Sequence, residues 1–477
     1  MISFTRLPNR IAGVLLLAAL FLLILHPALA QQTATAPSPA PSAKNNPEFL
    51  AMADEVLQEM SAITGWELKT PLKKSIRSRE EIHAYVLREM DDEKDAKERY
   101  ASKRSAEAFG LIPKGFDLDG FMVDLLTEQI AGLYDPKAHE FYIADWIDPE
   151  DQRTVMSHEL THALEDQHFQ IEAWVKAARP NDDAEMARES VLEGSAMAAM
   201  LEYMLKEKGL KLRGLPDFDL SISALKLRDL PDIDPSIFVG DLSETPMLKK
   251  APPFIKDSLM FPYFSGLTFS LAVLKNDGWK GFANVFARPP ATTQQIMHPD
   301  LYRTGKSLLP IKLNLPEGLP GSGWTLLEEN SMGEFGWKEV LKQFLDADRA
   351  GKLAAAWDGD VYATYESKDA KRLLLFTRVR LDSNESAARF FGQYSEALEK
   401  KYTVRSNLFR RPDFFSFDAP DGGVFLRCFQ NECVSVEGGG RTLILQWNKK
   451  LGWEAIPEVP RKPDESEVKV TRLFSAR

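Results

Sequence analysis

Cysteine is scarce in this chain, because its 477 residues include only Cys428 and Cys433. Both stand within residues 424–436, where apolar runs flank Asn431 and predict a tight hairpin. A zinc site built on the two thiolates would need a second pair of ligands nearby, and the sequence has none there. A disulfide across the hairpin is therefore the favoured prediction for a chain exported to an oxidising compartment.

Acidic residues are absent from residues 1–30, as is typical of a secretory signal. Arg6 and Arg10 supply a positive start, Ile11 to Leu25 is an unbroken apolar run, and residues 28–30 read Ala-Leu-Ala, a cleavage pattern. The run is shorter than the roughly 20 residues of a spanning helix, so cleavage is favoured over a retained membrane anchor. No cysteine follows it, which argues against a lipoprotein. We expect residues 1–30 to be a signal peptide and the protein to be exported, either periplasmic or secreted.

Positive charge is also in short supply. The chain has 59 Lys and Arg against 70 Asp and Glu, a net charge of -11, and removal of Arg6 and Arg10 with the signal would leave -13. This balance argues against nucleic acid and anionic membrane surfaces as main partners. Hydrophobic residues make up 44% of the chain, as in an ordinary globular protein, so no integral membrane domain is expected after signal cleavage.

The rest of the chain divides into a linker and two folded parts. Residues 31–46 are rich in Ala, Pro, Ser, Thr and Gln and predict a flexible linker. Residues 47–310 are mostly helical in pattern, and residues 311–477 mix strand and helix patterns. The predicted fold class is α+β: a mostly helical domain with a small edge sheet, followed by a smaller α+β domain of unknown role. Whether residues 47–110 belong to the first domain or form a self-inhibiting segment is left open.

Local signals place several elements within these parts. Ser78 and Glu81 form a capping box at the start of a helix. Apolar and aromatic runs on both sides of Asp135 and Pro136 predict a β-hairpin. Asp148 is placed to cap the helix that follows. In the C-terminal part we expect a helix and several strands, at residues 386–401 for the helix and at 361–365, 373–379, 424–436 and 442–447 for the strands.

The residues that carry chemistry are in the helix after Asp148, where residues 158–162 have the pattern H-E-x-x-H. His158 and His162 are four residues apart, so they lie about 40° apart around the helix axis and one turn above another. Two imidazoles so placed can bind one metal ion, and Glu159 projects beside them toward a metal-bound water. The pattern therefore predicts two zinc ligands and one general base from a single helical turn.

A catalytic zinc needs a third protein ligand, and the next long helix, predicted over about residues 184–208, offers Glu189 and Glu193 on one face. We favour Glu193 as the ligand, because Gly194 follows it and lets this helix approach the motif helix closely. Glu189 is then a partner of the ligands or a surface acid, and the reverse assignment of the two glutamates stays open.

Two further polar residues stand just beyond the motif. Asp166, one turn after His162, is a candidate to accept a histidine N–H and fix its tautomer. A solvated helical aspartate is the alternative interpretation of it. His168 is expected to be a structural or surface residue rather than a ligand.

The H-E-L-T-H sequence at residues 158–162, followed by Glu-Gly-Ser-Ala at residues 193–196, resembles the gluzincins, zinc metallopeptidases with two His ligands and one Glu ligand. The stretches 128–136, 158–169 and 294–299 are also similar to uncharacterised exported bacterial gluzincin-like proteins. The resemblance covers about residues 120–300. It implies a zincin-like domain over residues 47–310 and one zinc ion per chain.

The resemblance also implies how a substrate binds. An edge strand over the active-site cleft would pair with an extended peptide, and Gly132, Leu133 and Tyr134, or the partner strand of their hairpin, are its natural candidates. His298 is a candidate for the residue that assists the oxyanion, and a structural histidine is the alternative. The spacing from His162 to the third ligand is longer than in thermolysin-like enzymes, and the C-terminal part lies outside the resemblance.

These observations predict a zinc-dependent peptidase that hydrolyses peptide bonds of a peptide or protein substrate, with Glu159 as general base. Two alternatives stay open. One is a non-catalytic, zinc-containing binding protein, in which the C-terminal part carries the binding function. The other is a zinc hydrolase that acts on a non-peptide amide such as cell-wall material.

Overall fold

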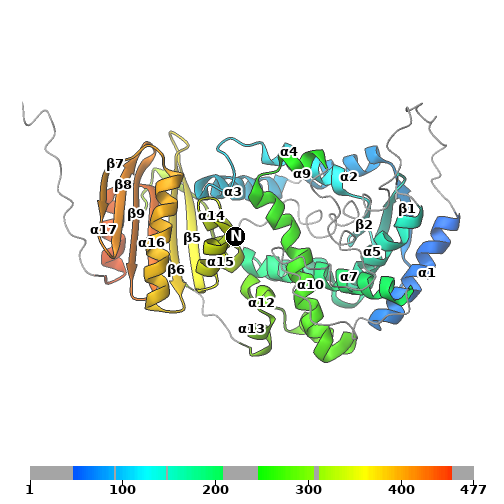
Figure 1. The fold of residues 1–477 in the computed structure, drawn as a ribbon. Helices are drawn as coiled ribbons and strands as arrows, with labels where there is room; N and C mark the ends of the chain where they lie inside the picture. Colours follow the sequence, from blue (N-terminus) through cyan, green and yellow to red (C-terminus); the bar gives the residue numbers. More distant parts are fainter. Residues whose placement is uncertain (1–46, 91–92, 147–148, 208–244, 306–310, 454–477) are drawn as a thin grey trace, which may run out of the picture.

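The computed structural model describes residues 47–90, 93–146, 149–207, 245–305 and 311–453. The predicted signal peptide, the predicted linker and Asp148 lie outside these residues. Helices dominate the described part before residue 305, and a large antiparallel sheet dominates the part after residue 311, as Figure 1 shows. The α+β fold class is thereby confirmed.

The helical part is built around three long helices. α5 (Pro149–Phe169) carries the H-E-x-x-H residues, α7 (Asp182–Glu207) follows it, and α10 (Pro253–Phe282) packs along α7. The shorter helices surround them and are α1 (Pro47–Thr64), α2 (Arg79–Met90), α3 (Glu93–Phe109), α4 (Leu118–Gln129), α6 (Ile171–Lys176), α9 (Pro246–Lys250), α11 (Asn284–Ala287), α12 (Thr293–Met297) and α13 (Pro299–Arg303). The capping box at the start of α2 is confirmed, since the Ser78 N–H donates to Glu81 and the Glu81 N–H donates to the Ser78 hydroxyl.

A three-stranded sheet lies beside α5. The predicted hairpin is confirmed as β2 (Gly132–Asp135) and β3 (Glu140–Ala144), which pair antiparallel. β1 (Lys73–Arg77) pairs parallel with β3, so the strand order is β1-β3-β2 and β2 is an edge strand. Because α1 packs on α5 and α7, and β1 completes the sheet, these parts of residues 47–110 are integral to the fold of the helical part.

Helices α7 and α10 cross in very close contact at two glycines. A Cβ atom built on Gly194 would lie 2.1 Å from the backbone of Gly266, and one built on Gly266 would lie 2.0 Å from the carbonyl oxygen of Ser190. The close approach predicted at Gly194 is therefore real, but the prediction of its partner was wrong. The helix that approaches is α10, not the motif helix α5. By length and composition α10 also has the character of a membrane-crossing helix, yet 72% of its apolar window is buried inside the protein.

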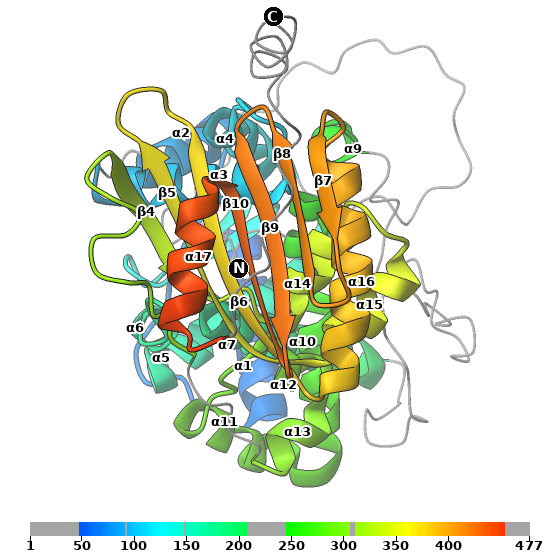
Figure 2. The ribbon, with the colours of Figure 1, turned by 90° about the vertical axis from the view of Figure 1, so that its left-hand side faces the viewer.

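The C-terminal part is a seven-stranded antiparallel sheet in the order β4-β5-β6-β10-β9-β8-β7. Its strands are β4 (Trp324–Asn330), β5 (Trp357–Ser367), β6 (Leu373–Leu381), β7 (Ser406–Arg410), β8 (Phe414–Ala419), β9 (Gly422–Phe429) and β10 (Glu432–Gly439), and its helices are α14 (Gly333–Lys342), α15 (Ala347–Ala354), α16 (Asn384–Lys401) and α17 (Arg441–Lys450). Cys428 and Cys433 face each other across β9 and β10 and form the predicted disulfide. Figure 2 shows α17 lying over the strands.

The strand predicted at residues 442–447 was wrong, because this segment is helix α17. Ile444 and Trp447, three residues apart, are fully buried and pack with Phe376 of β6. A run rich in Leu, Ile and Trp satisfies strand and helix patterns equally well when it is short. Residues 441–450 form a helix because one face of α17 then covers an apolar face of the sheet that would otherwise be exposed.

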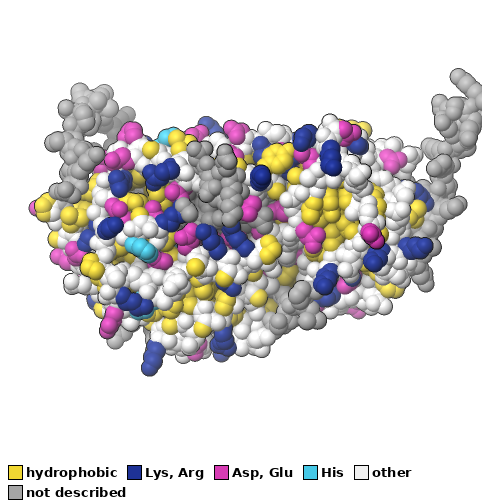
Figure 3. Space-filling model, turned by 180° about the vertical axis from the view of Figure 1, so that it is seen from behind, with side chains coloured by type: hydrophobic (Ala, Val, Ile, Leu, Met, Phe, Trp, Pro, Cys, Tyr) yellow, Lys and Arg dark blue, Asp and Glu magenta, His cyan; other side chains and the backbone are white. Residues whose placement is uncertain are grey.

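One apolar core joins the helical part to the sheet. Phe109, at the end of α3, packs edge-on against Tyr362 of β5 and Trp337 of α14, with ring centroids 5.1 and 6.3 Å apart. The same cluster of buried residues extends from Phe49 in α1 to Cys433 in β10. On the face seen in Figure 3, acidic and basic side chains are interspersed around the apolar surface.

The first turn of α7 is bonded to distant segments. The N–H of Asp182 donates to the side-chain oxygen of Asn330, 3.0 Å away, and the carboxylate of Asp183 accepts from the N–H and the hydroxyl of Thr293 at 3.1 and 2.5 Å. Asp183 is 1% exposed. Burial raises the pKa of its carboxyl from 3.8 to about 7, although the hydrogen bonds from Thr293 oppose the shift.

We expect this buried carboxyl to make stability fall as the pH rises. The folded chain holds the Asp183 proton up to about pH 7, whereas the unfolded chain releases it near pH 3.8, so the free energy of unfolding decreases between these values by at most about 1.4 kcal/mol per pH unit. An Asp183→Asn variant keeps an acceptor for Thr293 and should lose part of this decrease. Urea unfolding from pH 4 to pH 8 measures it, and equal slopes for both chains would contradict the role of Asp183.

Candidate metal centre

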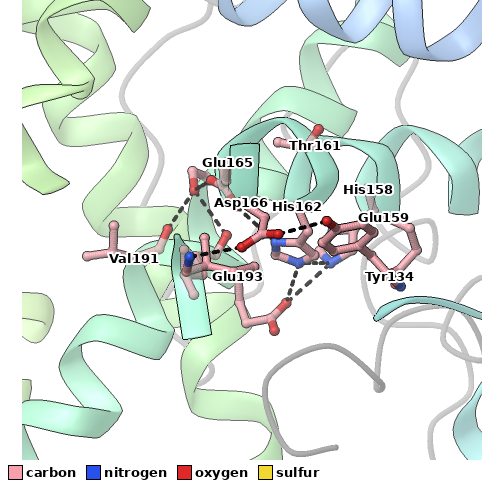
Figure 4. Close-up of polar contacts among 12 residues, drawn as sticks. Tyr134, His158, Glu159, Thr161, His162, Glu165, Asp166, Val191 and Glu193 are labelled. Carbon is pink, nitrogen blue, oxygen red and sulfur yellow. Dashed lines mark hydrogen bonds and ion pairs between the residues drawn. The ribbon is translucent and has the colours of Figure 1, made fainter. Parts of the chain in front are cut away.

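The two histidines of the motif and Glu193 meet at one point between α5 and α7. The Nε2 atoms of His158 and His162 are 3.2 Å apart, and Oε2 of Glu193 lies 3.2 Å from the first and 3.5 Å from the second. All three residues are at most 2% exposed. Figure 4 shows the three donor atoms converging from the two helices.

These distances match those between ligands of a zinc ion. Zn–N and Zn–O bonds of about 2.0–2.2 Å in tetrahedral geometry place neighbouring donor atoms about 3.3–3.6 Å apart. The second oxygen of Glu193 is buried and has no hydrogen-bond partner among the described residues. A metal ion can be held by three or more His, Cys, Asp or Glu side chains that lie close together. Among the described residues, His158, His162 and Glu193 form such a group. The donor set therefore fits zinc in number, chemistry and spacing.

The surroundings of His158 and Glu193 favour the protonation states that a metal requires, whereas His162 must release a proton to bind one. Burial lowers the pKa of His158 to about 4, so its imidazole is neutral at pH 7. Burial opposes ionisation of Glu193, but the nearby His162 outweighs it and lowers the pKa of the carboxyl. Burial also opposes the charged form of His162, whereas Glu193 and Glu165 raise its pKa above the usual value. Neutral imidazole and ionised carboxylate are the forms that bind metal.

Glu159 lies beside this centre and faces the edge strand. One of its carboxylate oxygens accepts the N–H of Tyr134 at 3.0 Å. The other is buried and has no hydrogen-bond partner among the described residues. Burial raises the pKa of Glu159 to about 8, and a nearby cation would lower it by stabilising the carboxylate. The free oxygen is thus available to a reacting group.

The partner of His162 differs from the predicted one. Glu165, not Asp166, contacts the ring: its Oε2 lies 2.9 Å from Nδ1 of His162, and its Oε1 accepts the hydroxyl of Ser195 at 2.5 Å. Such a contact fixes the tautomer that presents Nε2 to a metal. The prediction for Asp166 was therefore wrong. It does accept from a histidine, but from the exposed His139 at 3.0 Å.

His298 has an acidic partner in the C-terminal part that its predicted role did not include. It follows α12, and its Nε2 bonds both oxygens of Glu334 in α14, at 2.9 and 3.1 Å. This hydrogen bond raises the pKa of His298, although partial burial opposes the shift. The contact joins α12 to the C-terminal part, in line with the structural alternative, and the oxyanion role of His298 stays a prediction. His168 is structural as well, since its Nε2 contacts the carbonyl oxygen of Glu67.

Two further residues complete the surroundings. Glu189 is buried one turn before Glu193, and burial, with Glu185 and Glu193 nearby, raises its pKa well above the usual value. Its predicted role as a partner of the ligands stays a prediction. The ring of Tyr263 in α10 lies 6.2 Å from that of His158. The sequence gives no signal for this residue, because it stands in a long apolar helix among many other buried aromatic residues.

Comparison with known proteins gives one finding, and it concerns the C-terminal part. A family model described as a domain of unknown function (DUF8575) matches residues 325–440, which run from β4 to the end of β10. No match to this chain was found among curated proteins or among solved structures. The similarity to this family covers the sheet from β4 to β10. His158, His162 and Glu193, the group that could hold a metal, lie outside the matched residues.

Proposed function

We propose that this protein is a zinc-dependent peptidase of the gluzincin type. The observation that carries the proposal is the spacing of three donor atoms on His158, His162 and Glu193, at 3.2, 3.2 and 3.5 Å from one another, with the carboxylate of Glu159 beside them. An open fourth position on such a three-ligand zinc is the arrangement of catalytic rather than structural sites. The resemblance of residues 158–162 and 193–196 to gluzincins supports the same conclusion.

In this proposal each residue has a defined task. His158, His162 and Glu193 would hold the zinc, which lowers the pKa of bound water toward about 7 and polarises the scissile carbonyl. Glu159 accepts the proton of the attacking water and then delivers it to the leaving amine. Its bond with the Tyr134 N–H holds one carboxylate oxygen still, so that the second is oriented for this transfer.

The edge strand supplies groups for an extended peptide. Ala144 donates its N–H to the carbonyl of Ala131, so Leu133 is the next residue bonded to β3, and the backbone groups of Gly132 and Tyr134 point away from β3. The Tyr134 N–H is taken by Glu159, which leaves the Gly132 and Tyr134 carbonyls as acceptors on that edge. All four residues of β2 are buried in the described structure. A substrate strand would therefore pair there only by displacing what covers this edge, through hydrogen bonds that do not depend on its side chains.

Metal content tests the proposal first. The purified chain should contain about one zinc per molecule by elemental analysis, and Glu193→Ala should lose most of it, since the variant keeps only two ligands. Glu202→Ala, on the same helix but bonded to Trp279, is the matched control and should retain its zinc.

Two results would count against the proposal. A wild-type chain that contains no zinc, even after incubation with it, would exclude a zinc site at these three residues. One that holds zinc but cleaves no peptide in a broad peptide mixture would favour a binding protein or a hydrolase of other amides.

A further inference from the structure

Asp166 joins three separate segments at a buried point on the motif helix. Its Oδ2 accepts the hydroxyl of Tyr134 at 2.8 Å and contacts Nδ1 of His139 at 3.0 Å, and its Oδ1 accepts the N–H of Ile171 at 3.2 Å. The carboxylate is 6% exposed. It thus holds β2, the hairpin turn and the start of α6 on α5, while it contacts neither metal-binding histidine in the described structure.

Tyr134 is bonded to α5 at two points. Its backbone N–H donates to Glu159 and its side-chain hydroxyl donates to Asp166, seven residues further along the helix. Seven residues correspond to about 10.5 Å along a helix axis. One strand residue therefore spans two turns of α5, which fixes both the distance and the direction of β2 relative to the helix. Figure 4 shows Tyr134 reaching along α5 in this way.

The strand is short and has one hydrogen-bonded neighbour, although its four residues are buried. β2 has four residues, pairs with β3 alone and lies at the edge of its sheet. It comes so close to α5 that a Cβ atom on Gly132 would lie 2.6 Å from Val155 and 3.4 Å from Glu159. A small displacement of β2 would break the bond from the Tyr134 N–H to Glu159, since hydrogen bonds weaken steeply with distance and angle.

We propose that the bond between the Tyr134 hydroxyl and Asp166, referred to here as the tether, positions Glu159 for catalysis by keeping the Tyr134 N–H on its carboxylate. Tyr134 and Asp166 are then positioning residues that act through Glu159. The inference rests on the proposed function for its catalytic part, whereas the docking of β2 on α5 is independent of it. Adjacent residues of one helix have different tasks: Glu165 orients His162, and Asp166 orients the general base.

The test uses hydrogen–deuterium exchange of the peptide that spans β2, read by mass spectrometry on the full chain. Tyr134→Phe removes only the hydroxyl, and Asp166→Ala removes the carboxylate that accepts it. Each should speed exchange in β2 by about tenfold or more, and the double variant should exchange no faster than the faster single one, because both changes remove one bond. Exchange in α7 and in the C-terminal sheet should not change.

Two matched controls separate the tether from general loosening. Tyr142→Phe removes a hydroxyl from the neighbouring strand, where the ring packs on Tyr85 and Arg77, and should leave β2 exchange as in the wild type. Glu165→Gln should weaken zinc binding by about 10- to 100-fold and also leave β2 exchange unchanged. Tyr134→Phe and Asp166→Ala should keep wild-type zinc affinity.

Kinetics give the second readout. With the zinc-loaded protein, both tether variants should lower kcat by about 10- to 100-fold, because a misplaced base impairs the reaction. Any rise in KM that comes from displacement of the β2 edge should be smaller than this loss. Unchanged β2 exchange in both variants would overturn the tether, whether or not the protein is a peptidase. Faster exchange with an unchanged kcat would overturn the positioning role. A wild-type chain without peptidase activity would reject the proposed function and the catalytic role together, while the exchange comparison would still decide whether the tether holds β2.

Discussion

A Glu159→Gln chain should bind as much zinc as the wild type and hydrolyse peptides about 10²- to 10⁴-fold more slowly. The amide keeps the size of the carboxylate and keeps an oxygen that accepts the Tyr134 N–H, so the local structure is maintained. It cannot take a proton from water, and the general-base step is lost. Elemental analysis and turnover of a peptide mixture by the same preparation measure both effects.

Glu202→Gln is the appropriate control for this result, because Glu202 lies on α7 and is bonded to Trp279 rather than to the centre. It should retain both zinc and activity. Full activity of Glu159→Gln would exclude Glu159 as the base. Loss of zinc from Glu159→Gln would show instead that the variant disturbs the ligands, and Glu159→Asp, which shortens the side chain but keeps the charge, would then separate geometry from chemistry.

Gly266→Ala should destabilise the protein by about 1–3 kcal/mol or more, the range seen when extra atoms are forced into a packed core. The added methyl group would lie 2.0 Å from the Ser190 carbonyl oxygen, a backbone atom that no side-chain rotation can move away. The helices must therefore separate. Because Glu193 stands beside the crossing on α7, zinc content should fall together with stability. Urea unfolding with elemental analysis of the folded protein measures both.

Gly392→Ala should instead stabilise the protein. Gly392 lies on the exposed side of α16, and nothing is within 4 Å of its added Cβ. Alanine is favoured over glycine in a helix, so this variant should gain about 0.5–1 kcal/mol. If Gly266→Ala is as stable as the wild type, the crossing of α7 and α10 is looser than its backbone contacts indicate.

The pairing of His158 with His162 could be predicted from the sequence because its geometry is local. His158 and His162 share one helical face by spacing alone, and the long helix with Glu193 is recognisable between polar breaks. The hairpin of β2 and β3, the disulfide and α16 follow from short-range patterns in the same way. β1 was missed, since residues 73–77 show no alternation of apolar and polar side chains.

The remaining errors concern contacts between segments that are distant in sequence. Glu165 and Asp166 both lie near His162 on a helical wheel, and the choice between them depends on Tyr134, which draws Asp166 away. His298 stands in a short polar segment near the zinc helices in sequence, but its partner Glu334 is 36 residues further on. Spacing along one helix cannot identify a partner on another element, as Gly194 and Gly266 also illustrate.

The bonds at the first turn of α7 set the order in which this protein can be completed during synthesis. Asp182 needs Asn330, which is 148 residues further along, and Phe109 needs Tyr362 to close the core. A growing chain that has already produced His158, His162 and Glu193 still lacks the residues that anchor the helix of the third ligand. Contacts of such long sequence separation form late and slowly. We therefore expect the side chains of His158, His162 and Glu193 to come together stably only after the sheet has been made.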